Sequence, residues 1–120
     1  MAGRHIFYNQ SAFDGSNAAI QTTIAGVNND DEDARDTSKS ALLPGAGAAT
    51  WANITGYDKG INGIMIDLSS GVDHSGLTLA NVANNFIFKV GNNNTPANWA
   101  VAPAPNALSV IAGGGVTGSD

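Results

Sequence analysis

The chain contains no cysteine and few charged side chains. Without cysteine it forms no disulfide and offers no thiolate to a metal, so packing, or a hard cation held by oxygen ligands, must stabilise its 120 residues. Five basic residues against ten acidic ones argue against a nucleic-acid partner, because no basic patch neutralises a phosphate backbone. The sequence has no apolar run of the roughly 18 residues needed for a membrane span, which argues against membrane insertion.

What the chain does contain is mostly small and polar: Asn, Gly, Ser, Thr and Ala are abundant. At this length we expect one domain over residues 1–120, able to bury roughly two thirds of its unfolded surface. The composition is typical of an extracellular β module, whereas intracellular helical proteins carry more Glu and Lys. The first residues show no signal-peptide pattern, so the expected secreted or cell-surface location depends on composition.

The pattern of apolar residues predicts an all-β fold. Residues 57–68 form the most strand-like run, because Ile64, Ile66 and Leu68 alternate with Met65 and Asp67. We expect them to be the central strand of an antiparallel β-sandwich of cohesin-like or carbohydrate-module-like type. Further strands are expected at residues 4–9, 50–55, 85–91 and 106–111, shorter extended pieces at 38–45 and 99–101, and helical turns at 18–24 and 77–83.

An acidic segment at residues 28–36 carries five carboxylates within nine residues. Carboxylate and amide oxygens are the ligands that Ca²⁺ prefers, and a bound cation would relieve their mutual repulsion. The candidate calcium ligands are Asp14, Asn17, Asp30, Asp31, Asp33 and Asp36. The residue order is not that of an EF-hand, and the alternative is a solvated surface loop.

Aromatic residues suggest a second kind of site. Trp51, Tyr57 and Trp99, with Tyr8, could stack against the C–H face of a sugar ring. The alternative is that the two tryptophans fill the core or cover a sheet edge.

No arrangement of residues indicates catalysis. His5 and His74 are far apart in sequence, and no nucleophile elbow accompanies them. We therefore expect a non-enzymatic protein.

Several stretches together resemble a known module. They are RHIFYNQSAFDG (4–15), KSALLPG (39–45), WANITGYDKGINGIMIDL (51–68), FIFKVGNNNTPANWAVAPAP (86–105) and VIAGGGVTGSD (110–120). They resemble a non-catalytic β module of large secreted or surface proteins of aquatic bacteria, often found beside dockerin segments. The resemblance covers nearly the whole chain and implies an extracellular assembly role. The sequence departs from the module in two ways. Its acidic segment is richer in carboxylates, and members of the module continue beyond the Gly-Ser-Asp stretch into further strand-rich sequence.

A sandwich without its last strand has unpaired backbone groups and a gap over its apolar face. We therefore expect an interaction or assembly module that is one part of a two-chain complex, completed by strand addition from a protein or peptide partner. The residues expected to contact that partner are Val110, Gly114, Val116 and Asp120. The alternatives are a complete domain with a glycine-rich tail, a carbohydrate-binding module, and a passive spacer in a multidomain protein.

Overall fold

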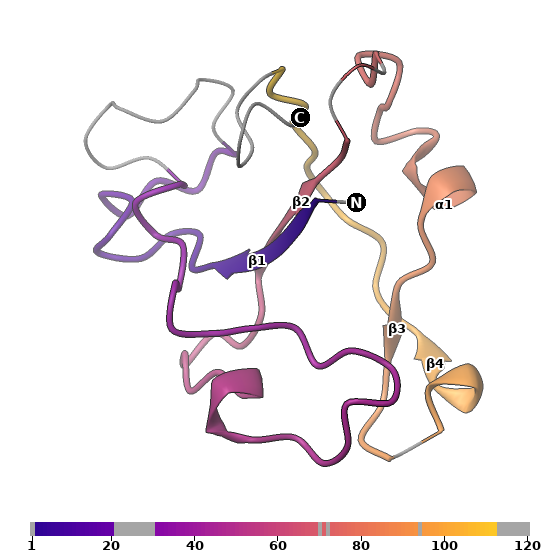
Figure 1. The fold of residues 1–120 in the computed structure, drawn as a ribbon. Coiled ribbons are helices and arrows are strands. Elements are labelled where there is room, and N and C mark those ends of the chain that lie inside the picture. Colours follow the sequence, from indigo (N-terminus) through magenta and orange to yellow (C-terminus); the bar gives the residue numbers. More distant parts are fainter. Residues whose placement is uncertain (1, 21–30, 70, 72, 94, 113–120) are drawn as a thin grey trace.

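The computed structural model describes residues 2–20, 31–69, 71, 73–93 and 95–112 (Figure 1). The elements in chain order are β1 (Gly3–Phe7), the 3₁₀ turn η1 (Trp51–Asn53), β2 (Gly63–Asp67), the short helix α1 (Val82–Asn85), β3 (Lys89–Val90), the 3₁₀ turn η2 (Pro96–Asn98) and β4 (Ala100–Val101). Turns and extended loops make up most of the remaining described chain. Among the described residues, no helix has the length and apolar character that crossing a membrane requires.

Strands β1 and β2 pair in antiparallel fashion, although more than fifty residues separate them in sequence. Phe7 lies opposite Gly63, and the ladder runs to the pair Gly3 and Asp67. The Phe7 ring packs directly over Gly63, where an added Cβ would lie 2.6 Å from ring carbons. Gly63 is therefore required for this contact, because any side chain would displace the ring.

The second ladder is short and lies below and to the right of the first in the view of Figure 1. Strand β3 pairs with β4 through Lys89 opposite Val101 and Val90 opposite Ala100. The Ala102 N–H continues this pairing by donating to the Phe88 carbonyl at 2.9 Å. After β4 the chain runs back past β2 as an extended segment, residues 102–111, shown in yellow-orange (Figure 1).

The apolar core is small. Among the described residues, the buried apolar side chains are those of Phe7, Ala34 and Val82. Ile64 is 54% exposed and Ile87 is 82% exposed, although such residues usually fill the core of a domain this size. Apolar surface that a closed fold would cover is thus open on this chain.

The β-rich, antiparallel character predicted from the sequence is confirmed. Strands lie within the stretches predicted at 57–68 and 99–101, and β1 overlaps the stretch predicted at 4–9 but begins one residue earlier. The paired strands form two-stranded sheets, so the sandwich itself stays a prediction. Within the described part of the chain β2 has one strand neighbour, β1, so the expectation of a central strand is not met.

Three other strand predictions were wrong or too long. The stretch 50–55 contains η1 in place of a strand, because the Asn53 side chain accepts hydrogen bonds from the Thr50 N–H at 2.9 Å and from the Thr50 hydroxyl at 3.0 Å and closes a turn. The strand predicted at 85–91 shortens to Lys89–Val90, because Asn85 ends α1. Residues 106–111 begin with a bend at Asn106 and have no ladder partner in the described chain.

The predicted helical turns were also displaced. The one expected at 77–83 begins at Val82 and ends at Asn85. Residues 18–20 of the turn expected at 18–24 are not helical, and the rest of that turn lies outside the described residues.

Candidate functional site

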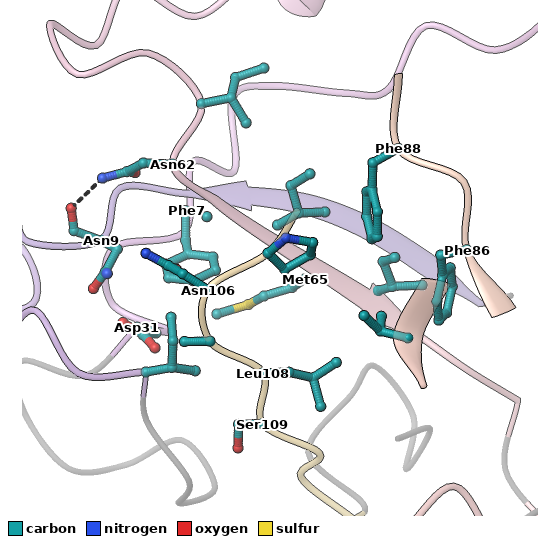
Figure 2. Close-up of a pocket in the computed structure, with 18 of the residues that line it drawn as sticks. Phe7, Asn9, Asp31, Asn62, Met65, Phe86, Phe88, Asn106, Leu108 and Ser109 are labelled. Atoms are coloured by element: carbon teal, nitrogen blue, oxygen red, sulfur yellow. Dashed lines mark hydrogen bonds between the residues drawn. The ribbon is translucent and has the colours of Figure 1, made fainter. Parts of the chain in front are cut away.

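A cleft of about 1120 Å³ opens beside β2 (Figure 2). One wall is the continuous run of residues 61–68, which contains all of β2, and the other is formed by residues 86–90 and 102–111. Pockets for drug-sized ligands measure roughly 300–1,000 Å³. The volume of this cleft is just above that range, so it has room for a short segment of polypeptide.

The cleft has an apolar interior. Figure 2 shows the side chains of Phe7, Met65, Phe86, Phe88 and Leu108 around it, contributed by four separate stretches of chain. The Phe86 and Phe88 rings are 6.2 Å apart between centroids and inclined by 30°. Both phenylalanines are half-buried, so part of each ring is accessible from the cleft.

Polar and charged groups also line the cleft. The Asn62 amide donates to the Asn9 carbonyl at 2.7 Å, which ties the start of β2 to the loop after β1 (Figure 2). The charged residues in the lining are three carboxylates and one ammonium, namely Asp31, Glu32, Asp67 and Lys89. The lining of the cleft thus has a net negative charge, as does the whole chain, whose net charge is −5.

The predicted metal ligands are used in different local structures. Asp14 is 1% exposed, and its carboxylate accepts the Gln10 N–H at 2.5 Å and the Ser11 N–H at 2.9 Å. The Asn17 N–H donates to the Asp14 carbonyl at 3.3 Å, and the Asn17 side chain accepts the Ala19 N–H. Asp14 and Asn17 therefore close the loop after β1 by bonding to its backbone.

Asp36 belongs to a separate hydrogen-bond network. Its carboxylate accepts the Tyr8 hydroxyl at 2.6 Å, the Ser38 hydroxyl at 2.6 Å and the Ser38 N–H at 3.0 Å. The Ser38 and Tyr8 hydroxyls hold the pKa of the Asp36 carboxyl below its usual range, because they stabilise the charged form. The same carboxylate raises the pKa of Tyr8, since the phenol donates to it only while protonated.

The remaining predicted metal ligands are divided. Asp31 is buried and lines the cleft, Asp33 is exposed, and Asp30 lies outside the described residues. The part of the chain that the structure describes contains no group of three or more acidic or histidine side chains arranged to hold a metal ion. Because the segment is described only in part, calcium binding stays a prediction.

The predicted aromatic platform is dispersed. Trp51 is 81% exposed on η1, with the Lys39 ammonium 5.8 Å from its ring centroid. Tyr57 packs against Tyr8 with ring centroids 4.6 Å apart. Trp99 donates its indole N–H to Asn93, beside η2, and Figure 1 shows η1 and η2 on opposite sides of the lower half of the molecule. The structure therefore does not bring the two tryptophans together.

Of the residues expected to contact a partner, Val110 lines the cleft. Gly114, Val116 and Asp120 lie outside the described residues. The sequence reasoning missed the wall formed by Met65, Phe86, Phe88 and Leu108. Their apolar character was visible, but which strands would leave them uncovered depends on pairing between distant segments.

Comparisons with known proteins give no relative: no protein-family model, curated protein or solved structure matches this chain.

Proposed function

We propose that this chain is a non-catalytic, extracellular interaction module, one part of a two-chain complex, whose cleft receives an apolar segment of a partner protein. The observation that carries the proposal is the cleft itself, apolar inside and bounded by two extended stretches of chain. Exposed apolar surface that is contiguous and concave is typical of protein-binding sites.

The energetics favour an apolar occupant. Fully burying an aliphatic or aromatic side chain contributes about 1.5–3 kcal/mol. Ile64 is more than half exposed, and Met65, Phe86 and Phe88 are only partly covered. An occupant that covers these side chains gains the burial free energy of several of them. This free energy offsets the entropy cost of ordering both chains.

The test is affinity capture by the full chain from the secretome of the source organism. The wild type is compared with Leu108→Asp, which places a carboxylate in the cleft wall, and with Leu42→Asp, a matched change at a 46% exposed residue outside the lining. We expect one partner, retained by Leu42→Asp and lost by Leu108→Asp. Capture that both variants retain, or no capture at all, contradicts the proposal and favours a passive spacer.

A carbohydrate-binding module is the second candidate, and the exposure of Trp51 is the observation that favours it. An indole that is 81% exposed beside a lysine offers a flat face for a sugar ring. This reading predicts binding to insoluble polysaccharide that Trp51→Ala removes and Leu108→Asp leaves intact. Binding with the opposite dependence would reject it.

Calcium binding by the acidic segment is a further part of the proposal. A cation held by Asp31 and its neighbours would stabilise the folded chain by mass action. We expect millimolar CaCl₂ to raise the melting temperature of the wild type and not that of Asp31→Asn. Asp58→Asn, at an exposed carboxylate outside the segment, is the control and should keep the full rise. An equal rise in all three proteins would contradict a site at Asp31.

A further inference from the structure

The direction of the backbone groups in β1 can be read from its hydrogen bonds. The Ile6 carbonyl accepts the Asp36 N–H at 3.0 Å, and the Tyr8 N–H donates to the Ala34 carbonyl at 3.0 Å. Along a strand, successive residues direct their backbone groups to opposite edges. The even-numbered residues of β1 therefore face residues 34–36, and the odd-numbered ones face β2.

The pairing register between β1 and β2 also determines which edge each backbone group of β2 faces. Gly63, Met65 and Asp67 lie opposite odd-numbered residues of β1, so their backbone groups face β1. Ile64 and Ile66 direct theirs to the other edge, and no described residue forms a hydrogen bond with the N–H or C=O of either.

The cleft borders this edge. Every residue from 61 to 68 lines it, including both odd and even positions. Successive side chains of a strand point to opposite faces, so a lining of consecutive residues agrees with a strand whose edge borders the cavity.

We propose that the partner segment enters the cleft as a β-strand and forms a ladder with Ile64 and Ile66, an inference that rests on the proposed function. An open strand edge is a template for an added strand, and a binding mode that uses it satisfies backbone groups as well as burying side chains. About five residues, at roughly 3.3 Å each, match the length of β2.

The occupant is an apolar strand of a partner protein with basic flanks. Met65 lies on one face of the ladder and Ile64 and Ile66 on the other, so both faces of an added strand meet apolar neighbours. Strands of this kind are continuous runs of Val, Ile, Leu or Phe. Three carboxylates line the cleft against Lys89, and one of them, Glu32, pairs with Arg35 at 3.0 Å. The net negative charge that remains favours Lys or Arg at the ends of the partner strand.

The experiment uses a synthetic peptide of about five alternating valines and isoleucines between two lysines, added to the full chain. Backbone amide exchange is followed by NMR. In the free protein we expect the Ile64 and Ile66 amides to exchange much faster than the Met65 amide, and the peptide to slow both by at least tenfold. The same peptide with glutamates in place of its lysines should bind at least threefold more weakly.

A matched pair of variants separates the ladder from the side chain. Ile64→Pro removes the edge N–H without removing a bond to β1, and Ile64→Ala keeps that N–H. We expect Ile64→Pro to bind the peptide about tenfold more weakly than Ile64→Ala, with the Met65 amide equally protected in both.

Failure of the strand mode differs from failure of the proposed function. If the peptide binds, Leu108→Asp abolishes binding, and the Ile64 and Ile66 amides still exchange freely, the cleft takes an apolar segment without a ladder and this inference is overturned. If neither peptide binds, both proposals are overturned. A dimer of the free chain that Ile64→Pro dissociates would assign the edge to a second copy and reject a partner strand.

Discussion

At the scale of single residues, Tyr8 connects three stretches of chain through its hydroxyl group. It donates to the Asp36 carboxylate at 2.6 Å and lies 2.8 Å from the Thr55 hydroxyl, so one side chain holds the acidic segment and the approach to β2 against the end of β1. A hydrogen bond to a charged group contributes more than a neutral one. Both partners are half-buried, so solvent weakens this bond.

This pair predicts a pH-dependent stability. Tyr8→Phe should cost about 1 kcal/mol of unfolding free energy at neutral pH, the lower part of the range for such bonds. Because the folded pKa of Asp36 is lowered, its contribution is present above about pH 4 and is lost as pH falls through the folded value. Because the folded pKa of Tyr8 is raised, its contribution is present below about pH 10 and is lost as pH rises further. Urea unfolding across pH measures both limbs.

The control is Tyr57→Phe. The Tyr57 hydroxyl donates to the neutral Gln10 carbonyl at 3.3 Å, so its loss should cost less than about 0.5 kcal/mol at neutral pH. A difference between wild type and Tyr8→Phe that stays constant from acid to alkaline pH would show that the Asp36 contact does not form in solution.

At the scale of elements, the β1–β2 ladder depends on the close packing of Phe7 on Gly63. Gly63→Ala should lower the unfolding free energy by about 1–3 kcal/mol, because the new Cβ would lie 2.6 Å from the ring. Gly56→Ala is the matched control, since a Cβ there meets nothing within 4 Å, and we expect it to be neutral or slightly stabilising. Equal stability of the two variants would mean that the Phe7 ring lies elsewhere.

The same ladder shows how much of the fold could be predicted from the sequence. β1 and β2 were predicted because alternation and β-branched residues are local signals, and both strands form. Their pairing with each other, and the open edge that results, depend on the fit of Phe7 to Gly63 across the sequence, which a local pattern does not encode.

Side-chain capping explains other differences between sequence and structure. The alternation at residues 50–55 predicted a strand, but Asn53 bonds back to Thr50 and makes a turn. Hydrogen bonds from side chains to nearby backbone also separate the predicted calcium site from the structure. Asp14 was selected for its carboxylate, and in the structure both its oxygens accept backbone N–H groups of its own loop. A polar side chain near its own backbone often bonds to it, and composition gives no sign of this choice.

At the scale of the whole molecule, the small core and the open cleft have the same consequence. A domain with little buried apolar surface has a small margin of stability, because the entropy cost of ordering the chain is only just offset. The free energy gained by closing the cleft should therefore be a large fraction of the total stability of this chain. Stability and binding are coupled here through the side chains of the cleft wall.

This coupling predicts that the lysine-flanked apolar peptide raises the melting temperature. At a peptide concentration of about one hundred times Kd, mass action adds roughly 2.7 kcal/mol, which corresponds to a rise on the order of 10–20 °C for a domain of this size. Differential scanning calorimetry measures the rise, with the Leu108→Asp variant expected to show almost none and Leu42→Asp the full effect. A free chain that already melts well above 65 °C, binds no hydrophobic dye and gains nothing from the peptide would show that the cleft is closed in solution, because no apolar surface would then remain for a partner to cover.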